Sequence, residues 1–111
     1  MKLVIIVINK TELLEEVLEY MVEAGITGGT VYDSVGMGKI LVYDIPIFAA
    51  FKELMIGSKA SNKTIITSVE DDKLDEFIDG VDKILHFDEP GTGVLFAIDI
   101  YKSKGLPKGK K

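Results

Sequence analysis

Residues 24–39 read AGITGGTVYDSVGMGK and carry the chain from a helix end, through a strand, into a loop. Gly25 suits a helix stop, because glycine readily adopts the left-handed conformation that follows many helices. TVYDSV, residues 30–35, has the β-rich composition of a strand. The glycines of GMGK, Gly36–Lys39, let the backbone turn and expose N–H groups to an anion, while Lys39 supplies charge. Taken alone, such a turn is a weak signal and favours a plain flexible exit from the strand over an anion site.

A strand and a helix are expected before this stretch. LVIIVI, residues 3–8, is a continuous apolar run that predicts a strand buried on both faces. The following NKTELLEEVLEYMVEAG has helical spacing, with Asn9 or Thr11 as the expected N-cap. Its apolar stripe consists of Leu13, Leu14, Val17, Leu18, Met21 and Val22.

A second strand–helix–strand unit is expected after it. TIITSV, residues 64–69, predicts the third strand, and VEDDKLDEFIDGVDKIL, residues 69–85, predicts the second helix. Gly80 lies inside that helix, where glycine costs roughly 1 kcal/mol relative to alanine, and the sequence offers no reason for it. PGT at 90–92 predicts a turn, and GVLFAIDI at 93–100 the last long strand. The helix's apolar face consists of Leu74, Phe77, Ile78, Val81, Ile84 and Leu85.

The order of these elements predicts an α+β fold of the ferredoxin-like split β-α-β type (βαββαβ), with a long loop between the second and third strands. Two helices on one face leave the other sheet face bare, and in a small chain such a face usually packs on another subunit. The length of 111 residues fits a single domain spanning 1–111.

Charge and composition exclude several classes of function. Residues 1–101 contain 8 Lys against 18 acidic residues, which disfavours a nucleic-acid-binding face, and the basic tail at 102–111 fits a solvated terminus. No apolar run is long enough to span a bilayer, and the N-terminus lacks the features of a signal peptide. The chain has no Cys, which suits a cytoplasmic protein. All 13 basic residues are Lys, so any anion site must use backbone N–H groups and Lys.

No arrangement of residues supports an enzyme or a metal site. His86 is the single histidine and has no partners for a catalytic triad, so a structural or surface role is favoured. The acidic residues of 71–82 are spread around a helix, as on a solvated face, and nothing places Asp33 beside Asp44. GMGK lacks the spacing of a Walker motif, and no helix obviously follows it. A small ferredoxin-like enzyme or metal-binding trimer is disfavoured, because such proteins usually need Arg or clusters of His or Cys.

The stretch 24–39 resembles the PII signalling family, nitrogen regulatory protein P-II and its PII-like relatives. In that family a G-I-T-G-x-T-V segment follows the first helix, and a G-x-G-basic turn opens the long T-loop. The matching residues are Gly25, Ile26, Thr27, Gly28, Thr30, Val31, Gly36, Gly38 and Lys39. The opening MKLVIIVINK and the last strand GTGVLFAIDI also match in place. The chain is identified as a divergent member, with residues 39–63 as its T-loop equivalent.

The resemblance implies a cytoplasmic homotrimer that binds an adenine nucleotide (ATP, ADP or AMP) in clefts between subunits and regulates a protein partner. Backbone donors of Gly38 and Gly91–Gly93 would face phosphate, and Lys39 would supply charge. The nucleotide-binding residues that the resemblance implies are Ile8, Thr30, Gly36, Met37, Gly38, Lys39, Gly91, Thr92 and Gly93.

Several positions depart from the family pattern. Val94 stands where the family has a Lys, Ile40 stands where it has the Gln that helps to hold 2-oxoglutarate, and its basic pair after the last strand falls near Gly105 and Pro107. Each missing charge-assisted contact removes about 1.5–3 kcal/mol. We therefore expect a less charged nucleotide such as ADP or AMP, or none. The alternative function is a structural or interaction trimer without nucleotide binding.

Residues 39–63 read KILVYDIPIFAAFKELMIGSKASNK and are more apolar than a usual T-loop. PIFAAFKELM predicts a short helix that Pro46 begins. This helix either folds back on its own trimer or docks on a partner, for which the family suggests a membrane transporter or an enzyme. The expected docking residues are Pro46, Ile47, Phe48, Phe51, Leu54 and Met55.

Overall fold

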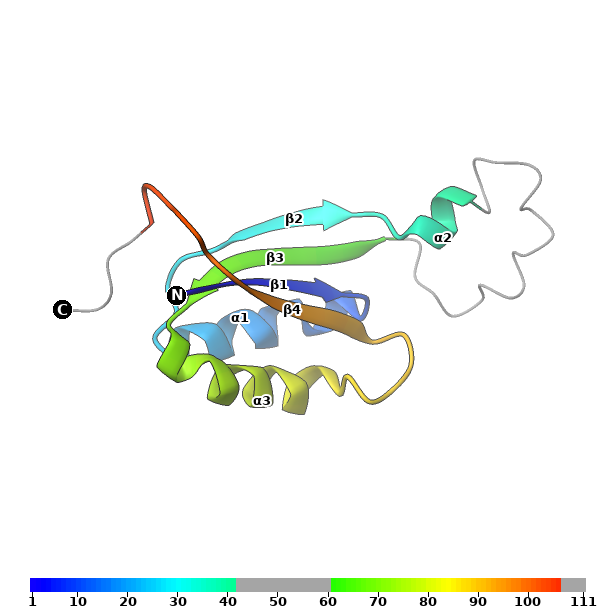
Figure 1. Ribbon diagram of the computed structural model, residues 1–111. Helices are drawn as coiled ribbons and strands as arrows, with labels where there is room; N and C mark the ends of the chain where they lie inside the picture. Colours follow the sequence, from blue (N-terminus) through cyan, green and yellow to red (C-terminus); the bar gives the residue numbers. More distant parts are fainter. Residues whose placement is uncertain (42–60, 107–111) are drawn as a thin grey trace.

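Four antiparallel strands form one sheet in the order β2-β3-β1-β4. A computed structural model describes residues 1–41 and 61–106 of the chain. The strands are β1 (Lys2–Ile8), β2 (Thr30–Ser34), β3 (Asn62–Val69) and β4 (Gly93–Asp99), and the helices are α1 (Leu14–Glu23), α2 (Met37–Lys39) and α3 (Leu74–Leu85). Helices α1 and α3 lie on one face of the sheet, and α2 lies beyond the end of β2 (Figure 1). This arrangement agrees with the predicted ferredoxin-like α+β fold.

The central strand β1 alternates between a covered and an open face. Val4, Ile6 and Ile8 are completely buried beneath the helices, whereas the side chains between them are only partly buried. Burial on both faces, as the sequence predicted for residues 3–8, is therefore wrong for the single chain. The reason is that both helices cover the same sheet face, which leaves the opposite face without a second layer (Figure 1).

The helices close the core with their apolar stripes. Val17 and Met21 of α1 meet Phe77, Val81 and Leu85 of α3 in one buried cluster. This packing confirms most of the two predicted stripes. Val22 is an exception, because it is 64% exposed and lines a hollow beside the α1–β2 loop instead of the core.

The ends of α1 differ in how well the sequence predicted them. Gly25 has a φ of 85°, and its N–H donates to the Val22 carbonyl while Ile26 N–H donates to the Met21 carbonyl, which is a Schellman ending. At the other end, a 3₁₀ turn over Thr11–Leu13 precedes the helix, and neither expected residue caps it with a side chain. The N-cap prediction is therefore wrong, because the Asn9 side chain bonds elsewhere.

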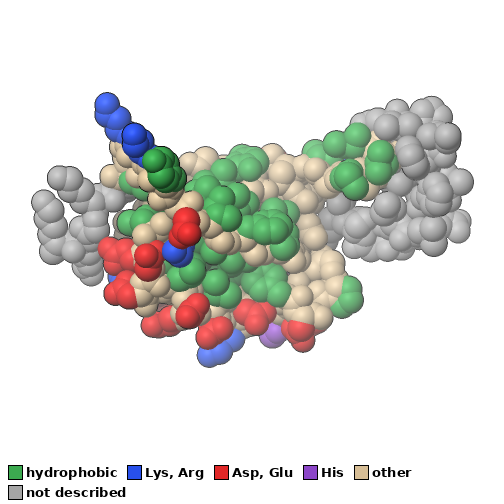
Figure 2. All heavy atoms as spheres, in the orientation of Figure 1, with side chains coloured by type: hydrophobic (Ala, Val, Ile, Leu, Met, Phe, Trp, Pro, Cys, Tyr) green, Lys and Arg blue, Asp and Glu red, His purple; other side chains and the backbone are tan. Residues whose placement is uncertain are grey.

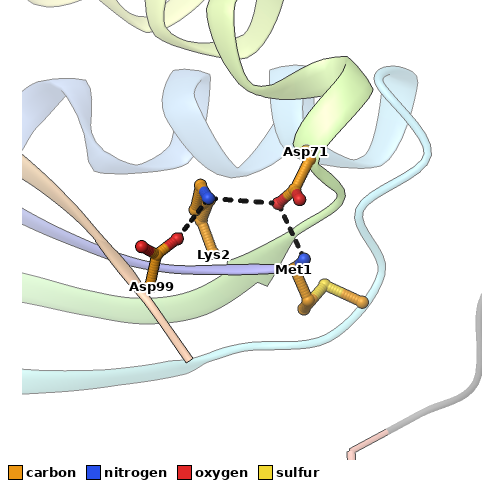
Figure 3. Close-up of polar contacts among 4 residues, drawn as sticks. All are labelled: Met1, Lys2, Asp71 and Asp99. Carbon is orange, nitrogen blue, oxygen red and sulfur yellow. Dashed lines mark hydrogen bonds and ion pairs between the residues drawn. The ribbon is translucent and has the colours of Figure 1, made fainter. Parts of the chain in front are cut away.

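A small charge cluster ties the N-terminus to the 3₁₀ turn Asp71–Lys73, which precedes α3, and to β4 (Figure 3). The N-terminal ammonium of Met1 lies 2.7 Å from Asp71 Oδ1, and Lys2 pairs with both Asp71 and Asp99. The hydrogen bond from the N-terminal ammonium is the main cause that lowers the pKa of Asp71, and the bond to Asp99 is the main cause that raises the pKa of Lys2. All these groups lie at the surface, where such pairs contribute little.

We expect Asp71→Asn to lower the thermal unfolding midpoint slightly at pH 7 and not at pH 2. A carboxylate whose folded pKa is depressed stabilises the fold above its unfolded pKa and loses that contribution as pH falls through the folded pKa. The difference between the variant and the unaltered chain should therefore close as the solution becomes acidic. Calorimetric scans of both proteins across this range test it, and a difference that persists at pH 2 would contradict it.

Candidate functional site

One end of the sheet gathers most of the residues expected to hold a nucleotide. In the strand register Ile8 lies opposite both Lys63 of β3 and Gly93 of β4, and Ser34 lies opposite Asn62. The end of β1, the start of β4, the end of β2 and the start of β3 therefore meet here. We call this region the glycine end; it comprises Ile8, Asn9, Ser34, Gly36–Lys39, Asn62 and the loop Pro90–Gly93.

The turn after β2 folds into a short helix. Met37–Lys39 form α2, with the Lys39 N–H donating to the Gly36 carbonyl at 3.1 Å. This helix lies within GMGK itself, and residues 42–60 beyond it lie outside the described residues, so the expectation that no helix follows GMGK stays a prediction. Met37 and Lys39 are exposed, so both side chains are open to a ligand or a partner.

The loop before β4 is held tightly by its own contacts. Thr92 is 1% exposed, and its hydroxyl lies 3.1 Å from the His86 carbonyl and 3.4 Å from the Glu89 carbonyl. The Thr92 side chain thus secures the loop, so contact with a ligand falls to the backbone. His86 ends α3 with a φ of 56°, which agrees with a structural role.

The glycines of this loop have different constraints. Gly91 has a φ of 77° and open space around the position of a side chain. Gly93 lies so close to β1 that a Cβ atom would stand 2.3 Å from the Val7 carbonyl oxygen. Gly93 is therefore required by strand packing.

Two of the expected residues do not present their side chains at the glycine end. The Ile8 side chain is completely buried in the core, so only its backbone is available there. Thr30 pairs with Ile66 and lines a hollow of about 540 Å³ that extends toward the opposite end of the sheet. The walls of this hollow come from the α1–β2 loop, the end of β3 and the C-terminal residues Ile100 and Leu106.

Sequence reasoning missed a polar network at the glycine end. Asn62 joins Ser34, Asn9 and the neighbourhood of Gly36, and the Ser34 hydroxyl also lies 2.6 Å from the Thr64 hydroxyl. Asn62 and Thr64 are buried although they lie on the sheet face that the helices leave open. The available signal was the alternating polar pair Asn62 and Thr64 at the start of the third strand, but nothing in the sequence indicated their partners.

The open sheet face is apolar. Phe96 and Ile98 of β4 are 53% and 51% exposed, and Val94 and Tyr32 also stand in solvent. In Figure 2 apolar side chains gather over the strands, whereas acidic side chains line the helix side of the molecule. A patch of this kind is typical of an interaction surface.

A comparison with protein families assigns the chain. The sequence profile of the family described as nitrogen regulatory protein P-II matches residues 1–109. The chain belongs to this family. A search of curated proteins finds no match to the sequence. PII proteins act as regulators in signal transduction and are typically trimeric.

Other expectations concern metals, membranes and the loop 39–63. No helix among the described residues is long and apolar enough to cross a membrane. Within residues 1–41 and 61–106, no three His, Cys, Asp or Glu side chains gather as metal ligands would. Asp33 pairs with Lys63 across the edge of the sheet. The predicted docking helix lies outside the described residues, together with Pro46, Ile47, Phe48, Phe51, Leu54 and Met55.

Proposed function

We propose that this PII family member is a homotrimeric, cytoplasmic regulator without enzymatic activity. It binds an adenine nucleotide in the clefts between subunits and controls a protein partner, a transporter or an enzyme, through residues 39–63. The observation that carries this proposal is the separation of the expected nucleotide residues into two groups on one chain. Gly36–Lys39 and Gly91–Gly93 belong to the glycine end, whereas Thr30 belongs to the hollow.

Two subunits bring these groups together more readily than one. The sheet is about 20 Å long at about 3.4 Å per residue of β1, and the apolar side chains of Ile5 and Phe96 lie between its ends. A nucleotide held at the glycine end of one chain therefore cannot also fill that chain's own hollow. A neighbouring subunit packed on the open face can place its hollow beside the glycine end.

The apolar face supports this packing. Fully burying a side chain such as Phe or Ile stabilises an assembly by about 1.5–3 kcal/mol. Phe96 and Ile98 are about half exposed in the single chain, and a neighbouring subunit on this face would bury that remaining surface. Leu3, Ile5 and Val7 lie next to them on the same face. A second layer from neighbouring chains would complete the burial that the sequence of β1 predicts.

The charges of the site favour a nucleotide with few phosphates. Val94 is exposed at the start of β4, where the family pattern has a lysine, and the chain contains no arginine to replace it. Lys39 and backbone donors are what remains for phosphate at the glycine end. ADP or AMP therefore fits this site better than ATP does.

We expect Gly38→Asp to abolish nucleotide binding while the trimer persists. The new carboxylate would stand among the backbone donors and repel phosphate. Titration calorimetry with ATP, ADP, AMP and cyclic dinucleotides measures binding, and light scattering measures the assembly. Gly38→Ala is the matched control: Gly38 has no positive φ, so alanine fits the backbone, and it should retain most of the affinity. If the unaltered chain binds no nucleotide even at millimolar concentration, the sensing role is wrong.

A structural or interaction trimer without nucleotide binding is the second candidate. Exposed Val94 favours it, because an apolar side chain stands where phosphate would need charge. Limited proteolysis separates the two functions. A regulator changes the cleavage of residues 39–63 when nucleotide is added, whereas a structural trimer gives the same pattern with and without it.

A further inference from the structure

Two asparagines link the exit of β2 to the loop before β4. The Ser34 hydroxyl donates to Asn62 Oδ1, Asn62 Nδ2 donates to Asn9 Oδ1 at 3.2 Å, and Asn9 Nδ2 donates to the Gly91 carbonyl at 3.1 Å. We call this chain of contacts, from Ser34 through Asn62 and Asn9 to Gly91, the asparagine relay. Its members come from four segments that are far apart in the sequence.

The relay fixes the orientation of two successive peptide groups. Asn9 holds the Gly91 carbonyl with its side chain and the Thr92 carbonyl with its backbone N–H, the latter at 3.0 Å. In a planar trans peptide the N–H points opposite to the carbonyl. The N–H groups of Thr92 and Gly93 therefore face away from Asn9. Loss of the Asn9 side chain releases the Gly91 carbonyl, while the Asn9 backbone N–H still holds the Thr92 carbonyl.

The same relay reaches the glycine turn after β2. Asn62 Nδ2 lies 4.0 Å from the point where a Cβ of Gly36 would stand, so the amide packs against that turn. Asn62 is 7% exposed, which means that its hydrogen bonds are hard to replace with water. One buried amide thus contacts the turn at Gly36 and, through Asn9, determines the position of Gly91.

We propose that Asn9 and Asn62 are positioning residues that hold the two glycine stretches of the nucleotide site in a fixed relation. The proposal rests on the proposed function, because the site is the one described there. Neither side chain needs to touch the nucleotide. The relay sets affinity by presenting the backbone donors of Thr92 and Gly93 in one orientation before the ligand arrives, which lowers the cost of binding.

An amide is the side chain that this role requires. Each asparagine accepts at Oδ1 and donates at Nδ2, and a residue with only one of these abilities interrupts the relay. Asn62→Asp keeps the size and the acceptor but removes the donor to Asn9. The Asn9 amide would then turn its Nδ2 toward the new carboxylate, and the Gly91 carbonyl would lose its donor.

The test combines calorimetry with amide resonances of the folded protein. We expect Asn62→Asp and Asn9→Ala each to weaken ADP binding about tenfold, the loss expected for one disrupted hydrogen-bonded contact. Both should shift the amide resonances of Thr92 and Gly93 in ¹H–¹⁵N spectra, although Asn62 touches neither residue. The double variant should bind no more weakly than either single variant, because both changes interrupt the same relay.

Lys2→Gln is the matched control. Lys2 is also a lysine paired with carboxylates, Asp71 and Asp99, but it lies at the opposite end of β1 from the glycine end. It should leave both ADP affinity and the Thr92 resonance unchanged. An Asn62→Asp protein with unshifted Thr92 and Gly93 resonances, or with unaltered ADP affinity, would overturn the proposal. If the unaltered chain binds no ADP, the proposed function fails and so does the link to affinity, whereas the resonances still decide whether the relay positions the loop.

Discussion

Gly93→Ala should destabilise the protein by about 3 kcal/mol or more, a cost at the upper end for a single substitution. A Cβ at this position would lie 2.3 Å from the Val7 carbonyl oxygen, and both belong to the paired backbones of β1 and β4 at the glycine end. Backbone atoms of β1 cannot move aside as the tip of a side chain can. Relief requires β4 to separate from β1 at its first residue.

Urea unfolding of Gly93→Ala and Gly91→Ala provides the comparison. Gly91 lies two residues earlier in the same loop and also has a positive φ, but nothing lies within 4 Å of the position of a side chain. Its replacement should cost about 1–2 kcal/mol, the ordinary penalty of a left-handed alanine. Equal costs for the two variants would contradict the argument, because only one of them meets a steric clash.

The order of strands and helices could be predicted because each element has a local signal. The apolar run of residues 3–8 predicts a strand, and β1 lies there. Gly25 predicts the end of the first helix, and α1 ends just before it. Asn9 shows where such reasoning stops. As an N-cap it would have bonded two or three residues away, but its side chain bonds Gly91, 82 positions along the chain. Whether the Asn9 side chain caps the helix or bonds Gly91 depends on tertiary contacts, which the local sequence does not show.

The candidate site was predicted by motif, and the roles of its residues were not. The glycine turn and the glycine loop meet at one end of the sheet, but the Thr92 hydroxyl is used within its own loop and the Ile8 side chain belongs to the core. Asn62 precedes an apolar run and has no motif of its own, so its position between Ser34 and Asn9 was invisible in the sequence. Hydrogen bonds between distant strand ends leave no periodic pattern to find.

Gly80 was the one helical residue without a reason in the sequence, and Tyr20 supplies the reason. The Tyr20 ring stacks on Phe77 with centroids 5.9 Å apart, and its hydroxyl lies 3.2 Å from the Glu76 carbonyl. The tip of this ring occupies the space above Gly80, where a Cβ would stand 2.0 Å from the ring and the hydroxyl. The absence of a side chain at Gly80 therefore leaves the space in which the Tyr20 ring packs between α1 and α3.

Gly80→Ala should consequently destabilise the fold by about 1–2 kcal/mol, although alanine is the better helix former. The substitution gains about 1 kcal/mol of helix propensity but drives the Tyr20 ring from its stacked position, which loses about 2–3 kcal/mol of burial and ring contact. The ring is partly exposed and can swing into solvent, so the loss is limited to its own contacts.

A double-mutant cycle with Tyr20→Ala tests this explanation directly, because the effect of Gly80→Ala on the free energy of unfolding should change sign when the ring is removed. Once the ring is absent, nothing but propensity distinguishes the two residues at position 80, so Gly80→Ala should stabilise the Tyr20→Ala protein by about 0.5–1 kcal/mol. Urea unfolding of the four proteins measures both effects. If Gly80→Ala has the same sign in both backgrounds, the glycine does not serve the tyrosine. A reversal would show that a helix-weakening residue is retained here because the packing between two helices needs the space.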